Sequence, residues 1–229
     1  MTFRFFFALF LLVTTFSFSQ PAVKSVKVKS RYLVEQYDVL AANDTVRHGT
    51  YRRYFREDNV LLEEGQYADN KRTGVWTFYD IRDRPGLVYD YSTQQVITNN
   101  RPFLDSMGFV LLDDKMTGVQ LTPPPIFLAS QYQISGILLR QSTIPAQLLY
   151  DGVSELSYQV AATVSPVGVS YRVVASHKDT AFNKNTLKAI SLAYKEVKWL
   201  PGYYQGEEVT AIYLLPTIKI RGFTVVRVN

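Results

Sequence analysis

The C-terminal part of the chain is organised around ELSYQVAATVSPVGVSYRVVA, residues 155–175. Its first half places apolar side chains at every second position, and the alternation resumes at Val169. The alternating positions are Leu156, Tyr158, Val160, Ala162 and Val164. Such a period of two is typical of a half-buried strand, and SPVG at 165–168 has the composition of a tight turn. The stretch therefore predicts a β-hairpin.

A helix and a further strand are predicted after this hairpin. Apolar residues recur at intervals of three and four across Leu187–Val197, which indicates one apolar stripe on a helix. Asp179-Thr180 or Asn183 would cap its start, and Pro201 would prevent it from continuing. A third strand is predicted over residues 208–220. The order β-β-α-β predicts a three-stranded sheet covered by one helix.

The segment after this helix carries a family resemblance. WLPGYYQGEEV at 199–209, followed by LPTI at 215–218, resembles the TonB C-terminal domain. That family has a helix, an aromatic residue, a proline and a small residue, then a glycine turn and a closing strand. The resemblance extends from about Ile144 to Arg221. Glu155 stands where the family usually has glycine, and Ile220 where phenylalanine is common.

The resemblance implies β-augmentation, because TonB domains capture an extended segment of an outer-membrane receptor along an exposed strand edge. Independently, Pro216 lacks an N–H for a ladder and so favours an edge strand, whose unpaired backbone groups can bind a peptide. The residues predicted to pair with a partner are Glu208, Val209, Thr210, Ala211, Ile212, Tyr213 and Leu214. Two alternatives stay open: the edge binds nothing, or the tail Phe223–Asn229 covers it.

A repeat occupies the N-terminal half. HGTYRRYF at 48–55 aligns with TGVWTFYD at 73–80, so that a glycine and two aromatic residues recur 25 positions later. These units resemble MORN-type repeats, most clearly in EGQYADNKRTGVW at 64–76. One hairpin cannot bury its own apolar face, so neighbouring hairpins must cover it. The candidate recognition face consists of Tyr51, Tyr54, Trp76 and Tyr79; alternatively, these four side chains are core aromatics.

The N-terminus has the order of a signal peptide. Arg4 is followed by an apolar run from Phe5 to Phe16 and then by small polar residues. We therefore predict export to the periplasm or cell envelope, with residues 1–19 as the signal peptide. An uncleaved segment that anchors the chain is the alternative, and any other membrane association is expected to be peripheral.

Composition argues against several functional classes. The chain has no cysteine, which excludes disulfides, thiol catalysis and cysteine-ligated metals. The net charge of +5 is too scattered to indicate nucleic-acid binding. The only histidines, His48 and His177, lie far apart in the sequence, and no nucleophile elbow or phosphate loop is present. We expect no enzyme activity, no cofactor and no metal site.

The sequence thus predicts an α+β protein in which β-rich MORN-like hairpin repeats precede a β-β-α-β domain similar to the TonB C-terminal domain. The predicted divisions are a signal peptide (1–19), repeats (20–100), a connector (101–142) and a C-terminal domain (143–229). The leading functional hypothesis is an envelope adaptor that binds a segment of an outer-membrane transport protein through its edge strand. A structural protein that acts through its repeats and an envelope hydrolase are the alternatives; the oligomeric state is not predicted.

Overall fold

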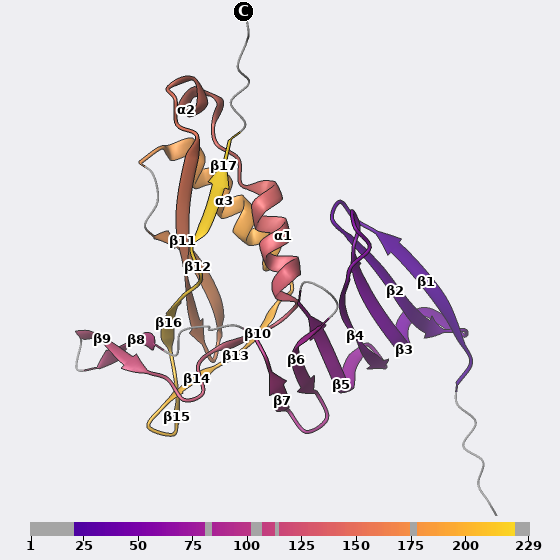
Figure 1. Cartoon of the computed structure of the whole chain (residues 1–229). Coiled ribbons are helices and arrows are strands. Elements are labelled where there is room, and N and C mark those ends of the chain that lie inside the picture. The colour runs from indigo at the N-terminus through magenta and orange to yellow at the C-terminus, as the bar shows by residue number, and fades with distance from the viewer. Residues whose placement is uncertain (1–20, 81–83, 102–106, 113–114, 175–177, 223–229) are drawn as a thin grey trace, which may run out of the picture.

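Seven antiparallel strands form the N-terminal part of the computed structural model (Figure 1), which describes residues 21–80, 84–101, 107–112, 115–174 and 178–222. Each strand pairs with the next one along the chain. The strands are β1 (Val23–Lys29), β2 (Leu33–Leu40), β3 (Asn43–Phe55), β4 (Leu61–Ala68), β5 (Lys71–Tyr79), β6 (Pro85–Asp90) and β7 (Gln95–Asn99). The predicted signal peptide and the tail 223–229 lie outside the described residues.

A second sheet and three helices form the C-terminal part, so the chain is a β-rich α+β protein. The helices are α1 (Gln131–Gln141), α2 (Ala146–Tyr150) and α3 (Thr180–Ala193). The strands are β8 (Met107–Leu112), β9 (Lys115–Gln120), β10 (Ile126–Leu128), β11 (Glu155–Ser165), β12 (Gly168–Val174), β13 (Lys198–Leu200), β14 (Gly202–Tyr204), β15 (Glu207–Val209), β16 (Ala211–Leu214) and β17 (Ile218–Arg221).

The long strand β11 organises this second sheet. It forms the predicted hairpin with β12 on one side. On its other side it pairs with β16 near its end and with β17 near its beginning. The strand predicted over 208–220 is therefore divided into β15, β16 and β17. Pro216 lies at the break between β16 and β17, where it has no N–H to donate to a ladder.

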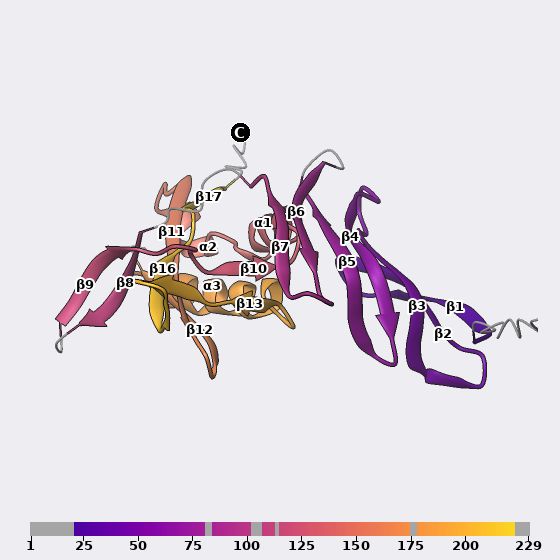
Figure 2. The same ribbon diagram turned by 90° about the horizontal axis from the view of Figure 1, so that it is seen from below.

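The predicted connector, residues 101–142, contributes four elements to the C-terminal part. β8 pairs with β16, β10 pairs with β13, and α1 packs against α3. Figure 2 shows α1 and α3 together on one face of the β12–β11–β17 sheet. The segment therefore contributes strands and a helix to the C-terminal part, because β8 pairs with β16 and β10 pairs with β13.

Helix α1 joins the two parts of the molecule. Its Gly136 backbone lies against the ring of Phe55, which belongs to the same buried cluster as the C-terminal core. Ser130 caps α1 by accepting a hydrogen bond from the Gln133 N–H, and its Oγ donates to the Tyr79 carbonyl at 2.6 Å. Arg101, buried beside β7, donates to the carbonyls of Phe127 and Ala129. These contacts fix the N-terminal sheet against α1 and β10.

Candidate functional site

The predicted partner-binding residues, Glu208–Leu214, fall on three segments. Glu208 and Val209 belong to β15, which pairs with β14, and Thr210 lies between β15 and β16. β16 lies between β11 and β8: Ala211 is opposite Val110, and Ile212 is opposite Phe109. The edge expected to be open at Ala211 and Ile212 is therefore occupied by β8. Tyr213 and Leu214 lie beyond the paired register with β8.

The open edge of this side of the sheet lies instead at β17. Among the described residues, β17 pairs with β11 alone. The Gly222 N–H donates to the Ser154 carbonyl at 2.8 Å, so residue 222 faces β11. Because alternate residues of an antiparallel strand direct their backbone groups to opposite sides, Lys219 and Arg221 direct theirs away from β11. In Figures 1 and 2, β17 lies at the margin of the sheet with α1 beside it.

A small apolar cavity of about 70 Å³ lies next to this edge. On the helix side it is lined by Gln131, Ile134, Ser135 and Leu138 of α1. On the strand side it is lined by Leu215, Pro216 and Ile218, which flank the break between β16 and β17. Val160, Phe127 and Tyr194 complete the lining, and all three side chains are buried. The interruption at Pro216 thus coincides with a hollow beside the open edge.

The side chains that point away from the helices give this edge a positive charge. Lys219 and Arg221 are both exposed. Arg221 Nε lies 2.9 Å from Glu155 Oε2 on the neighbouring strand. Lys219 forms no ion pair among the residues that the structure describes. The edge therefore offers outward backbone groups together with one uncompensated cation.

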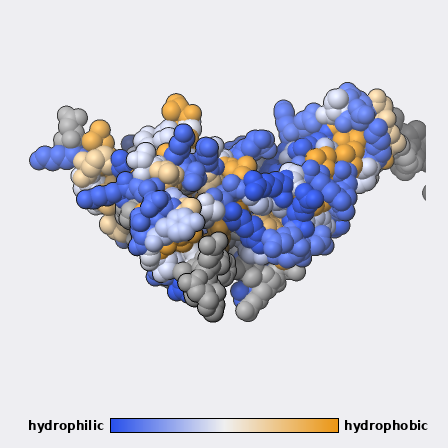
Figure 3. Space-filling view, turned by 90° about the horizontal axis from the view of Figure 1, so that it is seen from above, coloured by the Kyte–Doolittle hydropathy of each residue, from blue (hydrophilic) through white to orange (hydrophobic). Residues whose placement is uncertain are grey.

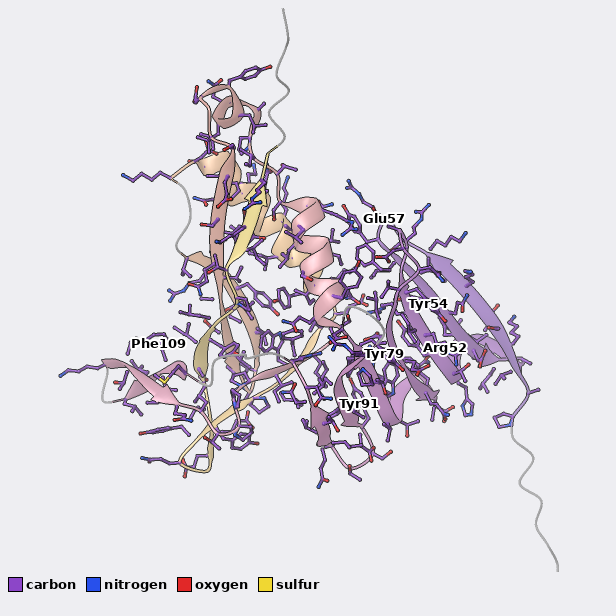
Figure 4. All side chains as sticks on the ribbon, viewed as in Figure 1. Arg52, Tyr54, Glu57, Tyr79, Tyr91 and Phe109 are labelled. Carbon is purple, nitrogen blue, oxygen red and sulfur yellow. The ribbon has the colours of Figure 1, made fainter. Side chains whose placement is uncertain are left out.

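Below β17, the β8–β9 hairpin borders the same side of the sheet. Phe109, Leu111 and Met116 on its outer face are 40%, 62% and 51% exposed. Figure 4 labels Phe109 on this hairpin, and Figure 3 shows apolar atoms reaching the surface at that end of the molecule. The sequence contained a signal for it: Asp113-Asp114 separates two short β-type runs, as in a tight hairpin.

The predicted aromatic recognition face is divided between the two faces of the N-terminal sheet. Tyr51 and Trp76 are buried on one face, with ring centroids 5.3 Å apart. Tyr54 and Tyr79 lie three residues further along their strands and are only partly buried. Because successive side chains in a strand alternate, an offset of three places them on the opposite face. The four aromatics therefore do not form one surface.

On that opposite face, Tyr54 and Tyr79 belong to a polar surface (Figure 4). The Tyr79 hydroxyl donates to Glu64 Oε1 at 2.5 Å. Arg52 Nε donates to the other oxygen of the same carboxylate at 3.1 Å. This half of the predicted face is accessible to solvent, whereas Tyr51 and Trp76 belong to the core.

The glycines of the repeat are explained by the backbone conformation and by close packing. The aligned glycines, Gly49 and Gly74, have positive φ angles of 104° and 60°, which glycine adopts without steric cost. At Gly65 the indole ring of Trp76 approaches so closely that an added Cβ would lie 2.3 Å from it. The repeated glycines thus permit a positive φ at Gly49 and Gly74, and Gly65 permits close packing of Trp76.

A buried ionic network crosses the N-terminal sheet. Glu63 is fully buried, and its Oε1 lies 3.1 Å from Arg53 Nη1 and 3.2 Å from Arg72 Nη2. Arg53 Nη2 also lies 2.6 Å from Glu35 Oε1. Burial alone would raise the pKa of Glu35, but Arg53 and Arg47 outweigh it and hold this pKa below its usual value of 4.5. The two arginines thus favour the ionised form of Glu35.

A larger cavity of about 330 Å³ lies between the two parts of the molecule. Its charged lining consists of two carboxylates, Glu35 and Glu196, and four cations: Arg31, Arg47, Arg53 and Lys195. A general acid needs a raised pKa, and the pKa of Glu35 is lowered. His48 Nδ1 lies 3.3 Å from Asp69 on a different surface, and His177 is outside the described residues.

The comparisons with known proteins identify no relative: no protein-family model, curated protein or solved structure matches the chain. Among the described residues, no helix has the length and apolar character that crossing a membrane requires. Within the same residues, no group of three or more potential metal ligands occurs.

Proposed function

We propose that this chain is an exported binding protein of the cell envelope that pairs the edge of β17 with an extended segment of an outer-membrane transport protein. The observation that supports this function is the one-sided pairing of β17, which leaves the backbone groups of Lys219 and Arg221 directed away from β11. An unpaired edge of this kind binds a peptide through main-chain hydrogen bonds.

The sequence supports the same function. The resemblance of residues 144–221 to the TonB C-terminal domain implies capture of a receptor segment, and the predicted signal peptide implies a location outside the cytoplasm. The proposed site is moved from Glu208–Leu214 to Leu214–Arg221, because β8 occupies the edge at Ala211 and Ile212. Pro216 and the exposed Lys219 protect such an edge against indiscriminate pairing.

The test is photo-crosslinking in envelope fractions, with a photoreactive residue in place of Thr217. Crosslinking is compared between the otherwise unchanged chain and two variants, Lys219→Pro and Lys219→Ala. Lys219→Pro removes an N–H that faces away from β11, so it should abolish crosslinking without disturbing the pairing between β11 and β17. Lys219→Ala keeps this N–H and should weaken crosslinking only a few-fold. The expected product joins Thr217 to an extended segment of an outer-membrane transport protein, identified by mass spectrometry.

Lys27→Pro is the matched control. Lys27 lies on β1, which pairs with β2 alone among the described residues, and its N–H also faces away from its neighbour. This variant should leave crosslinking from Thr217 unchanged. If the label joins only the chain's own residues 223–229, the tail occupies the edge and the adaptor function is wrong.

The polar and aromatic surface around Tyr54 and Tyr79 supports a second candidate, a structural protein that binds through its repeats. Val75 lies on the same face of β5 as Tyr79 and is 52% exposed. A photoreactive residue at Val75 that captures one defined protein, while Thr217 captures none, would favour this second function.

A further inference from the structure

The cavity beside β17 is built by one side of α1. Gln131, Ile134, Ser135 and Leu138 line it, and their spacing of three and four residues places them on one stripe of the helix. The opposite side of the helix is held by the N-terminal sheet: Arg140 Nε lies 2.6 Å from Glu57 Oε2, and its guanidinium lies over the Phe55 ring. The helix wall of the cavity is therefore fixed from behind.

The strand wall of the cavity is formed where the edge is irregular. The Leu215 N–H donates to the Val160 carbonyl at 2.9 Å, and pairing resumes with Ile218 opposite Tyr158. Three steps on the edge strand thus match two steps on β11, which is the geometry of a bulge. Pro216 is exposed at this bulge and Ile218 is half-buried, so the cavity opens beside the free backbone edge.

The size and the lining of the cavity restrict what can enter it. Its lining is apolar except for Gln131, Ser135 and the Tyr194 hydroxyl. An apolar cavity of about 150 Å³ admits benzene. The hollow of about 70 Å³ is half as large, so it suits a branched aliphatic side chain and is too small for an aromatic ring.

We propose that this cavity receives one aliphatic side chain, Val, Leu or Ile, of the segment that pairs with β17. The inference rests on the proposed function and specifies its partner. In a strand added to β17, every second side chain faces α1, and the residue opposite Ile218 lies over the cavity. Pocket recognition of alternate side chains is what gives strand addition its sequence selectivity.

The charge of the opposite face supplies a second element of the partner sequence. Lys219 follows Ile218 and points away from the helices, so a partner residue opposite Lys219 lies on the exposed face. An acidic side chain there would neutralise this cation. Because side chains alternate, the acidic residue stands at an odd-numbered separation from the aliphatic one. The partner is thus an extended segment with one aliphatic anchor and an acidic residue on its other face.

The test is selection of a phage-displayed library of random nine-residue peptides on the immobilised full chain. Enriched peptides should share one Val, Leu or Ile with Asp or Glu at an odd separation. A selected peptide, measured by fluorescence anisotropy, should lose affinity by about tenfold or more when its aliphatic residue becomes Ala or Phe. This peptide-side measurement does not depend on the folding of any protein variant.

The matching change in the protein is Ser135→Leu, which fills the cavity from the helix side and should cause a similar loss. Ser191→Leu makes the same substitution at an exposed position of α3 and should leave the affinity unchanged. Lys219→Pro should abolish binding of every selected peptide.

The two proposals fail in different ways. Peptides that require the Lys219 N–H but show no aliphatic preference and tolerate Ser135→Leu would overturn the cavity inference and leave the proposed function standing. Peptides that bind Lys219→Pro as tightly as the unchanged chain would show that they do not pair with the edge of β17, and the proposed function would be wrong. A library from which nothing is enriched on the full chain would overturn both.

Discussion

The two sheets of this molecule are assembled by opposite rules. In the N-terminal sheet every strand pairs with its successor, and the aromatic residues of neighbouring hairpins pack on one another. In the C-terminal sheet β11 and β16 take partners from distant parts of the chain, and β8 enters from a segment that precedes α1. The difference teaches that local pairing builds an interior from successive hairpins, whereas the non-local pairing of β11 with β16 and β17 leaves an interrupted edge at Pro216.

The largest expected effect concerns the interior of the N-terminal sheet. Trp76 is fully buried, packs against Tyr51 and Tyr67, and donates its indole N–H to the Gln66 carbonyl. Trp76→Ala should lower the free energy of unfolding by about 4 kcal/mol, measured by urea denaturation, because it leaves a large cavity. Val75→Ala, at an exposed neighbouring position, should change it by less than about 0.5 kcal/mol. Equal effects would mean that the aromatic interior does not stabilise the sheet.

A change in the ionic network of the same sheet should cause the second-largest loss of stability. Glu63→Gln removes the charge that lies between Arg53 and Arg72, and should destabilise the protein by about 3 kcal/mol because it leaves buried cations uncompensated. Glu64→Gln, at the half-buried partner of the exposed Arg52, should cost about 1 kcal/mol or less. Thermal or urea unfolding of the two variants measures the difference. A larger loss for Glu64→Gln would contradict the assignment of the buried network as the stabilising one.

A change at the junction between the two sheets should have a smaller effect on stability. Ser130→Ala removes both the cap of α1 and the hydrogen bond to the Tyr79 carbonyl. We expect the free energy of unfolding to fall by about 1–2 kcal/mol. Relative to the unchanged chain, hydrogen exchange of the α1 amides should accelerate more than that of the β3 amides. Ser135→Ala, within the same helix, should have an effect below about 0.5 kcal/mol. Unchanged exchange in α1 would show that this cap does not join the two parts.

The smallest effect should be a pH dependence located in the N-terminal sheet. Because the folded pKa of Glu35 lies below its usual value of 4.5, this carboxylate stabilises the fold above that value. The contribution is lost as the pH falls below 4.5 and through the folded pKa. Urea unfolding between about pH 6 and about pH 3 should show a shallower acid loss for Glu35→Gln than for the unchanged chain. Identical slopes for the variant and the unchanged chain would show that Glu35 does not contribute to the loss of stability in acid.

Much of the fold could be predicted from local patterns. The period of two in residues 155–174 corresponds to β11 and β12. The apolar stripe predicted across Leu187–Val197 corresponds to α3 only in part, because the helix ends at Ala193, before Val197, and leaves Leu187 exposed. The repeat predicted successive hairpins, and its aligned glycines, Gly49 and Gly74, both have the positive φ that a glycine permits. The assignment of Tyr51, Tyr54, Trp76 and Tyr79 to one face was wrong, although strand alternation alone was enough to separate them.

The candidate site was harder to predict because it depends on what lies next to each strand. Pro216 led to the prediction of one continuous edge strand, and it lies instead at the break between β16 and β17. Nothing in residues 208–220 reveals that β8 covers Ala211 and Ile212 and leaves Lys219 open. The cavity requires α1, β11 and the break at Pro216 to meet, and these elements are separated by tens of residues.

By itself, therefore, the sequence determined the features that depend on neighbouring residues: which stretches alternate, where α3 starts, and where glycine permits a positive φ. It did not determine where α3 stops, because Pro201 lies well beyond its end at Ala193. The tertiary structure alone decided which edge of the C-terminal sheet is covered, which is open, and where the cavity lies. The physical reason is that strand pairing is made by main-chain groups that every residue except proline carries in full. The choice among partners then falls to the packing of side chains that are remote in the chain.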